Sequence, residues 1–307
     1  MASPSAHWSN TDPFLNSSDL VSKFFLVENY ALAETLTSGQ AFRWREADDA
    51  WESVIDQRWV RLAEGRGGIT ATVMAGANSQ DWTWLTHHLQ LDVNLRKVQQ
   101  SFPGDEHMQK AVAECSGLRL LKQEPWECLA SFILSSTKQI VQIQQIVALL
   151  CERFGTPVPS PGANWCSFPG VERIAALSEA ELRCCKMGFR APYLKGSAEM
   201  IQRGEVNLNA IASLDVTAAR AELMRLPGVG RKIADCVLLF AYGFQQAFPV
   251  DVWVLKAIKQ LYFPRRSPNA KKVLKFTESY FGPNAGYAQQ YLFHYMRTRI
   301  GRERKIK

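Results

Sequence analysis

The sequence predicts an α+β protein, in which a small N-terminal antiparallel β-rich domain precedes a mostly α-helical body. Between about Phe24 and Met74 the chain consists of short aromatic or β-branched segments separated by turn residues. From about Asp81 onward the apolar residues recur at helical spacing instead. A Leu-Pro-Gly-Val-Gly turn at residues 226–230 lies between two amphipathic segments, a pattern typical of a helix-hairpin-helix.

Four short segments are expected to form the antiparallel sheet. Apolar and polar residues alternate well in the third segment and partly in the others. The four segments are residues 41–45, 51–55, 58–62 and 69–74. A short helix is expected near residues 31–37. The β-rich domain is therefore placed at residues 21–115, after a flexible N-terminus at residues 1–20 that is rich in Ser, Asn and Pro.

The remaining residues, 116–307, are expected to form the helical body. In residues 139–154, one face at helical spacing carries Ile140, Ile143, Val147 and Leu150. Asp92 and Asp215 are expected N-caps, because a short carboxylate can accept hydrogen bonds from the first N–H groups of a helix.

The charge of the chain favours a polyanionic partner. The formal net charge is +7 and the pI is about 9.0. The tail at residues 297–307 has six basic residues and one acidic residue, although a solvated helix end would look the same. No stretch approaches eighteen apolar residues, and the N-terminus lacks the pattern of a signal peptide. An intracellular protein is expected, in the nucleus of a eukaryote or in the cytoplasm and nucleoid of a bacterium.

The cysteines and histidines predict no metal site. Seven cysteines are scattered without a CxxC pair, which makes a zinc site or a disulfide framework unexpected. Among the five histidines only His87 and His88 are adjacent, and neighbouring residues point to different faces of a helix. We expect these two to be surface or core residues.

Lys232 and Asp251 are the most informative pair in the chain. Lys232 follows the hairpin turn, and Asp251 closes Phe-Pro-Val-Asp nineteen residues later. Gly228, Val229 and Gly230 can aim successive backbone N–H groups at one phosphate, as helix N-termini and backbone nests do. The lysine would then lie beside a bound DNA backbone. In isolation, a lysine at a helix start is a surface residue and an aspartate before a helix is a cap.

This segment resembles the signature of the helix-hairpin-helix DNA glycosylases that end in Gly-Pro-Asp, with Phe-Pro-Val-Asp at 248–251 in its place. Three more blocks narrow the resemblance to the 8-oxoguanine DNA glycosylases, over about residues 24–299. They are residues 38–44, residues 120–128 running on to Ser135-Ser136, and residues 286–293. No cysteine follows Cys236, which disfavours the branch with an iron-sulfur cluster. Lys232 disfavours the alkylpurine branch, which generally lacks the hairpin lysine.

The resemblance implies a monomeric, bifunctional repair enzyme that acts on double-stranded DNA containing oxidised guanine. Lys232 would attack the sugar of a flipped-out 8-oxoguanine nucleotide, and the imine would allow β-elimination at the abasic site. The amine must first lose a proton, which burial and the adjacent Arg231 would favour. Asp251 would stabilise the oxocarbenium-like sugar. No cofactor is implied, although backbone carbonyls of the hairpin could hold a structural cation.

Two other functions stay open. One is an alkylated-purine glycosylase on the same scaffold. The other is a non-catalytic DNA-binding protein that uses the hairpin as a grip. Lys232 with Asp251 argues against the second, and the residues of the base pocket argue against the first.

The resemblance also implies four residues of the base pocket. Gly39 matches the glycine whose carbonyl accepts the N7 hydrogen of 8-oxoguanine; normal guanine presents an acceptor there and would be repelled. Gln289 matches the reader of the Watson–Crick edge, because its amide both donates and accepts. Phe293 matches the ring that stacks on the base, and Cys236 the residue on the opposite face. Phe293 and Cys236 could equally be core residues, and Gly39 an ordinary turn residue.

The chain departs from the family pattern where the opposite strand is read. Arg190 matches one arginine that contacts the opposite cytosine, and Phe189 stands in place of a wedging tyrosine. Thr137 and Gln142 replace an asparagine and a second arginine, while Trp253 replaces a histidine after Asp251. Weaker recognition of the opposite cytosine is therefore expected.

Overall fold

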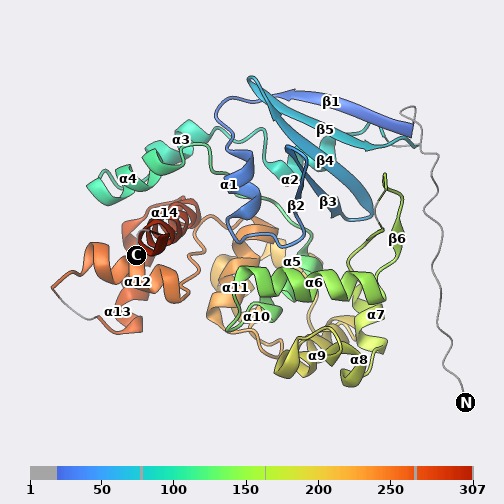
Figure 1. Ribbon diagram of the computed structural model, residues 1–307. Coiled ribbons are helices and arrows are strands. Elements are labelled where there is room, and N and C mark those ends of the chain that lie inside the picture. The colour runs from blue at the N-terminus through green and yellow to red at the C-terminus, as the bar shows by residue number, and fades with distance from the viewer. Residues whose placement is uncertain (1–18, 77–78, 163, 266–267, 306–307) are drawn as a thin grey trace, which may run out of the picture.

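The computed structural model describes residues 19–76, 79–162, 164–265 and 268–305. A β-sheet occupies one end of the molecule and helices fill the rest, with helix α1 (Leu32–Thr37) between the two parts (Figure 1). The predicted α+β class is confirmed. The flexible N-terminus predicted for residues 1–20 lies, up to residue 18, outside the described residues.

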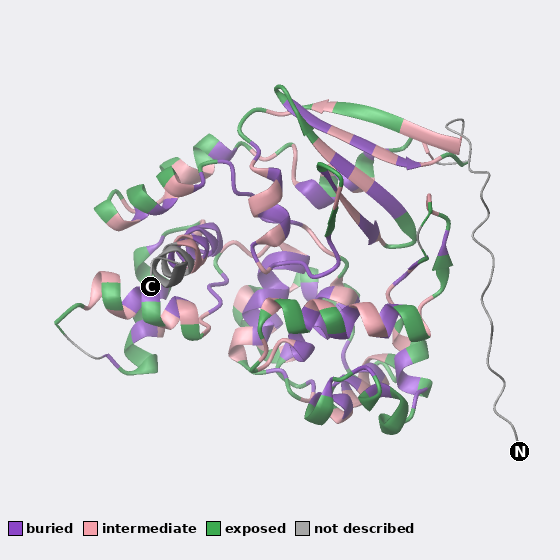
Figure 2. Ribbon diagram, in the orientation of Figure 1, coloured by how far each residue is buried: buried purple, intermediate pink, exposed green. Residues whose placement is uncertain are grey.

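The sheet has five antiparallel strands in the order β1-β5-β4-β3-β2. Val60 pairs with Val73 and Leu62 with Ala71, and all four are buried on one face. Buried positions alternate along β4 and β5, as a sheet with one packed face requires (Figure 2). The strands are β1 Leu20–Leu26, β2 Arg45–Ala47, β3 Ala50–Ile55, β4 Arg58–Gly65 and β5 Gly68–Met74.

The prediction of a strand at residues 41–45 is wrong. Only Arg45 enters β2, and residues 41–44 form irregular backbone. The reason is burial on both sides: Trp44 packs in the sheet core, whereas Phe42 packs in the helical core, 5.5 Å from the Phe132 ring. The edge strand β1 was not among the predicted segments, because its exposed Phe24 breaks the apolar–polar alternation.

Two small layers complete the β-rich part. Helices α1 and α2 (Thr83–Leu89) contribute Leu36 and Leu85 to the core beneath the sheet. A two-stranded ribbon, β6 (Pro157–Val158) and β7 (Trp165–Cys166), covers Val54 and Trp59 on another side. The short helix predicted near residues 31–37 is confirmed as α1.

The helical body holds one large core, into which Phe42 also reaches. Helix α14 packs against α12 and α4 (Figure 1). The helices are α3 Leu95–Gln100, α4 Glu106–Glu114, α5 Pro125–Leu134, α6 Ile140–Phe154, α7 Val171–Ala176, α8 Glu179–Arg183, α9 Ala191–Gln202, α10 Val216–Leu223, α11 Arg231–Val237, α12 Val252–Tyr262, α13 Ala270–Tyr280 and α14 Ala285–Lys305. Shorter turns are the 3₁₀ helices η2 Gly188–Arg190 and η3 Leu208–Ser213, and the π-helix η4 Leu238–Tyr242.

Of the two predicted N-caps, one is confirmed and one is wrong. Asp215 caps α10 by accepting hydrogen bonds from the backbone N–H groups of Thr217 (2.8 Å) and Ala218 (3.0 Å). Asp92 caps nothing, because α3 begins only at Leu95 and Asn94 takes the capping position. The face predicted for residues 139–154 is confirmed in α6: Ile143, Val147 and Leu150 are buried, and Ile140 is half-buried at its start.

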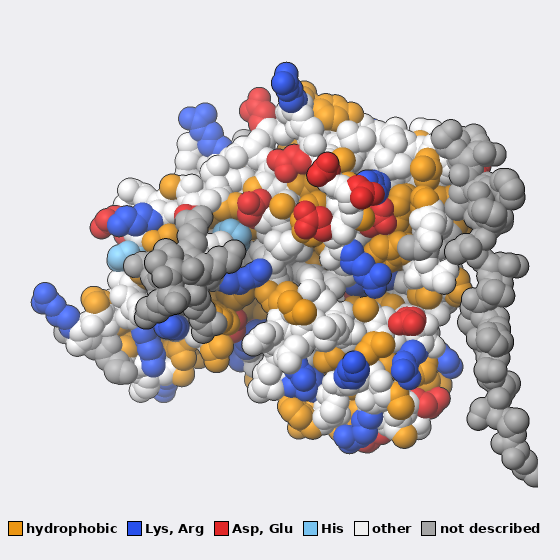
Figure 3. Space-filling view, viewed as in Figure 1, with side chains coloured by type: hydrophobic (Ala, Val, Ile, Leu, Met, Phe, Trp, Pro, Cys, Tyr) orange, Lys and Arg blue, Asp and Glu red, His pale blue; other side chains and the backbone are white. Residues whose placement is uncertain are grey.

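The surface carries its charges unevenly. On the face shown in Figure 3, acidic side chains gather over the sheet, whereas lysines and arginines are spread over the helices below. All seven cysteines are free thiols, and the described residues contain no group of three or more His, Cys, Asp and Glu side chains placed to hold a metal ion. Within the described residues, no helix is both long and apolar enough to cross a membrane.

Candidate active site

The hairpin turn between α10 and α11 is held firmly and presents its backbone outward. Gly228 has φ +74°, a conformation that favours glycine, and a Cβ there would lie 2.7 Å from Cγ of Tyr193. The Pro227 carbonyl accepts a hydrogen bond from the Ser197 hydroxyl of α9 (3.2 Å). Gly228 and Gly230 are exposed, and Gly230 precedes α11 without a side-chain cap. The first N–H groups of α11 are thus available to an anion.

Lys232 lies in the first turn of α11, half-buried against α5. Its Nζ is 5.0 Å from the centroid of the Phe132 ring and donates to Oγ of Ser135 (3.4 Å). The Ser135 hydroxyl donates its own proton to the Phe132 carbonyl (2.7 Å), so its lone pairs face the amine. The sequence assigned Ser135 no role, although it lies in a block that carries the resemblance.

Arg231 is turned away from Lys232. Its guanidinium pairs with Glu278 of α13 (2.6 Å) and with Asp235 (3.6 Å). Asp235 is buried and also accepts from Nε of Arg220 (2.6 Å). These bonds tie α10, α11 and α13 together. They also correct the expectation that Arg231 acts on Lys232 as an adjacent cation, because two carboxylates offset its charge.

Asp251 caps α12 by accepting from the Val254 backbone N–H (2.7 Å). Burial raises the pKa of Asp251, while that hydrogen bond and the nearby Lys232 ammonium oppose the rise. The preceding loop is fixed by Phe248, whose ring stacks on Phe281 with centroids 4.9 Å apart. The predicted capping position is confirmed, and the carboxylate is held close enough to Lys232 to interact with its charge.

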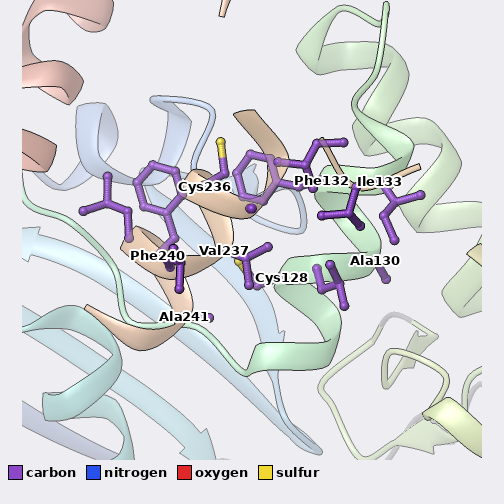
Figure 4. Close-up of a cluster of buried hydrophobic side chains, with 14 of the residues drawn as sticks. Cys128, Ala130, Phe132, Ile133, Cys236, Val237, Phe240 and Ala241 are labelled. Carbon is purple, nitrogen blue, oxygen red and sulfur yellow. The ribbon is translucent and has the colours of Figure 1, made fainter. Parts of the chain in front are cut away.

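Cys236 follows Lys232 by one turn of α11 and is buried. Burial raises the pKa of its thiol to about 12, so the thiol stays neutral at physiological pH. Cys236 belongs to the cluster in which α5 and α11 meet (Figure 4). In that cluster the Phe132 ring stacks on Phe240 at 5.6 Å and 15°. The side chains beneath the Lys232 amine therefore form a tightly packed contact between α5 and η4.

The structure brings Gly39 and Phe293 together. Gly39 has φ +81°, and a Cβ there would lie 2.8 Å from Cδ1 of Ile140 and 3.6 Å from Cε1 of Phe293. Gln289 lies one turn before Phe293 on α14 and is buried. Its Oε1 has no hydrogen-bond partner in the part of the chain that the structure describes. A buried amide oxygen without a partner is costly, which is consistent with a site that a ligand completes.

Replacing Gly39 by alanine should slow, by about tenfold or more, the excision of 8-oxoguanine that the resemblance implies. A side chain at positive φ costs about 1–2 kcal/mol, and its Cβ would lie too close to Cδ1 of Ile140, at 2.8 Å. Single-turnover excision measures the effect, and cleavage of a preformed abasic site, which has no base to seat, is the control. An alanine variant that excises at the parent rate would remove Gly39 from the pocket wall.

The residues expected to read the opposite strand meet at the loop between α5 and α6. Arg190 is buried and donates to the Ser136 carbonyl through Nε (2.9 Å) and Nη2, and to the Thr137 hydroxyl (2.6 Å). Thr137 has φ +56°. Phe189 is 54% exposed, with the Arg190 guanidinium 4.2 Å from its ring centroid. The side-chain oxygen of Gln142 accepts a hydrogen bond from the backbone N–H of Gln139 (3.1 Å), which forms part of a capping box at the start of α6.

Two of these residues already use part of their hydrogen-bonding capacity inside the protein. Arg190 already uses several of its donors inside the protein, including one to the Met187 carbonyl (3.2 Å). Gln142 uses its amide oxygen to cap its own helix. The roles of Arg190, Thr137 and Gln142 in reading the opposite base therefore stay predictions. Trp253 is half-buried in the first turn of α12, next to Asp251.

Two known protein families match the chain, one over the β-rich part and its neighbouring helices and one over most of the helical body. Residues 24–129 match the N-terminal domain of 8-oxoguanine DNA glycosylase, and residues 130–283 match the HhH-GPD superfamily of base excision DNA repair proteins. Fold and site together define a helix-hairpin-helix base-excision repair protein. Within that superfamily, the chain belongs to the 8-oxoguanine DNA glycosylase family.

Individual relatives agree. The N-glycosylase/DNA lyase of Saccharomyces cerevisiae is 32% identical over 277 residues, which cover 80% of this chain and 71% of that protein. The Clostridium acetobutylicum 8-oxoguanine glycosylase/lyase, solved with double-stranded DNA containing cytosine opposite 8-oxoG, is 31% identical with a TM-score of 0.86 and covers 92% of this chain and 97% of that one. A DNA-3-methyladenine glycosylase of Bacillus subtilis is 25% identical over 190 residues, covering 61% of this chain and 63% of that protein. The alkylpurine alternative thus has weaker support.

Proposed function

We propose that this protein excises 8-oxoguanine from duplex DNA and then cleaves the abasic site that remains. The observation that carries the proposal is the placement of Lys232 at the exit of the hairpin. Its amine is held over Phe132, against the Ser135 hydroxyl and near the half-buried Asp251 carboxylate. A non-catalytic hairpin that only binds DNA has no need of a half-buried amine within electrostatic reach of a carboxylate.

The chemistry follows from the amine. Lys232 loses a proton, and its nitrogen attacks C1′ of the damaged nucleotide while the bond to the base breaks; the base leaves with that electron pair and takes up a proton. Ring opening gives an imine between Lys232 and the sugar. Loss of a proton from C2′ then expels the 3′ phosphate, and water hydrolyses the imine to free the lysine. The Asp251 carboxylate stabilises the positive charge that develops on the sugar.

The pocket accounts for the choice of base. The Gly39 carbonyl accepts the N7 hydrogen of 8-oxoguanine, the Gln289 amide pairs with the Watson–Crick edge, and Phe293 stacks on the ring. The neutral Cys236 thiol packs against the other face. The unpartnered Gln289 oxygen supports this assignment, because a bound guanine ring can donate to it.

The rest of the hairpin binds the DNA backbone. The exposed backbone at Gly228 and Gly230 contacts a phosphate, and the exposed Phe189 fills the space left by the flipped nucleotide. The Val229 N–H expected to join them already donates to the Leu226 carbonyl (3.1 Å). No cofactor is needed for this chemistry. Because its proposed substrate is DNA, we expect the protein to act in the nucleus of a eukaryote or in the cytoplasm and nucleoid of a bacterium.

Trapping with borohydride tests the proposed reaction. Borohydride reduces an imine to a stable amine, so the protein should become covalently attached to a duplex that contains 8-oxoguanine. A matched duplex with guanine at the same position should give no adduct. Excision of the base without a trapped adduct would exclude the imine and leave a monofunctional glycosylase.

Discrimination between cytosine and adenine opposite 8-oxoguanine should be modest. Each good contact to a base edge is worth about 1–3 kcal/mol. In this chain the Gln142 side chain helps to cap α6, and Arg190 donates hydrogen bonds to the α5–α6 loop, which leaves fewer groups to contact the opposite base. Single-turnover excision from the two duplexes, at one fixed salt concentration, measures the ratio. A preference for cytosine on the order of a thousandfold, about 4 kcal/mol, would show that other side chains read the base. Gln142→Arg should sharpen the preference.

A further inference from the structure

Helix α14 grips the two carbonyl groups that immediately precede Gly39. The side-chain amide of Gln290 donates to the Ser38 carbonyl (3.0 Å), and the Arg297 guanidinium donates to the Thr37 carbonyl (2.9 Å). The two donors are seven residues apart, which is about two helical turns, so they lie on one face of α14. Gln290 is 3% exposed, and its bond to Ser38 is therefore shielded from water.

The backbone after Gly39 is held just as firmly from another side. The Gln40 side chain donates to the carbonyls of Thr35 (2.9 Å) and Arg119 (2.8 Å) and accepts from the backbone N–H of Leu121 (2.7 Å). The Gln40 carbonyl in turn accepts from Gln123 (2.7 Å). The peptide group before Gly39, and the side chain and carbonyl group of Gln40 after it, are thus fixed by bonds from different parts of the fold.

Gly39 itself needs such support. Glycine has more backbone freedom than any other residue, and its carbonyl direction is set by what holds its neighbours. Within the described residues, no hydrogen bond is made to the Gly39 carbonyl oxygen. The strength of a hydrogen bond falls steeply as its angle departs from linearity, so a carbonyl free to rotate would be a poor detector of one N–H group.

Gln289, the proposed reader of the base, lies next to Gln290, which holds the backbone before Gly39. Both side chains are buried on α14, one bonded to the Gly39 turn and the other with an unpartnered oxygen. One rigid helix therefore carries the proposed reader of the Watson–Crick edge and the donor that anchors the opposing wall. Any shift of α14 would move both walls of the pocket together.

We propose that Gln290 and Arg297 are positioning residues that set the direction of the Gly39 carbonyl and so determine selection of 8-oxoguanine over guanine. Neither side chain need touch the base. The inference rests on the proposed function, in which the Gly39 carbonyl accepts the N7 hydrogen of the damaged base. Gln290 has the larger effect, because its bond is to the peptide group that includes the Gly39 nitrogen.

Equilibrium binding by a Lys232→Gln background tests the proposal without turnover. Dissociation constants are measured for three duplexes that carry 8-oxoguanine, guanine or a tetrahydrofuran abasic analogue at one position. Gln290→Met keeps the length of the side chain but removes the donor. It should lower the ratio of guanine to 8-oxoguanine Kd by about five- to tenfold, the worth of one hydrogen bond. Affinity for the abasic duplex, which has no base to read, should change less than about twofold.

Matched variants on the same helix complete the test. Arg297→Met should lower the ratio less than Gln290→Met, and Arg297→Lys, which keeps a donor, should restore it. Thr298→Val is the control, because the Thr298 hydroxyl donates only to carbonyls of α14 itself, those of His294 and Tyr295 (both 3.0 Å). It should leave all three affinities unchanged.

Two results would overturn the inference alone. One is an unchanged ratio in Gln290→Met. The other is an equal loss of affinity for all three duplexes, which would make Gln290 merely structural. A third result is distinguishable from both: if the Lys232→Gln parent binds the 8-oxoguanine and guanine duplexes equally, the proposed base readout fails, and the inference fails with it.

Discussion

Replacing Lys232 by glutamine should abolish both base excision and strand cleavage while leaving DNA binding within about tenfold. Loss of a catalytic nucleophile typically costs at least about ten-thousandfold in rate. Glutamine keeps a polar side chain of similar length that can still meet the Ser135 hydroxyl, and the hairpin backbone that holds the phosphate is untouched. Single-turnover assays on an 8-oxoguanine duplex and on an abasic duplex measure the two activities separately.

Lys256→Gln is the matched control for this prediction. Lys256 is exposed on α12, and its replacement removes the same charge without touching the pocket. It should leave excision within about threefold of the parent, since one surface charge contributes little beyond affinity for phosphate. Rapid excision by Lys232→Gln would show that water, and not the amine, attacks the sugar.

The sequence was sufficient for features that depend on local pattern. The hairpin, its lysine and the capping aspartate are set by residue types at fixed spacing, and the structure places Lys232 and Asp251 close enough to interact. The β-strands after residue 50 follow from alternation. The strand predicted at residues 41–45 failed, because Phe42 and Trp44 are buried in different cores, a fact that no local pattern records.

Features that depend on contacts between distant segments could not be predicted. Arg231 looked like a cation beside the nucleophile, but Glu278, far along the chain, turns it away. Arg190 bonds to the Ser136 carbonyl, a contact that no local pattern reveals, and its role in reading the opposite base stays a prediction. Gln290 carried no signal beyond its place next to Gln289, and only the fold brings it to the Ser38 carbonyl. In each case a tertiary partner decides what a polar side chain can do.

Asp251→Asn should separate the structural role of this residue from its catalytic one. Asparagine caps a helix about as well as aspartate, so the bond to the Val254 N–H should survive. The charge that stabilises the sugar would be lost, and loss of one preorganised electrostatic contact typically slows catalysis by about a hundredfold to a thousandfold. The single-turnover rate of excision measures this. Asp215→Asn is the control: Asp215 caps α10 in the same way but is exposed, and its replacement should leave the rate unchanged.

The pH dependence gives the assignment of Asp251 a second, independent test. Burial raises the pKa of Asp251 above its unfolded value, so as pH rises the unfolded chain ionises first and the carboxylate lowers folding stability until the folded group has also ionised. Asp251→Asn removes that cost, and its melting temperature at neutral pH should equal or exceed that of the parent. The effect on activity has the opposite sign. The parent needs Asp251 to be ionised, so its excision rate should fall as pH drops through the raised pKa of Asp251. The asparagine variant should lack this loss of rate at acidic pH. A variant that melts lower, yet excises at the parent rate over the whole pH range, would leave Asp251 as a helix cap and nothing more.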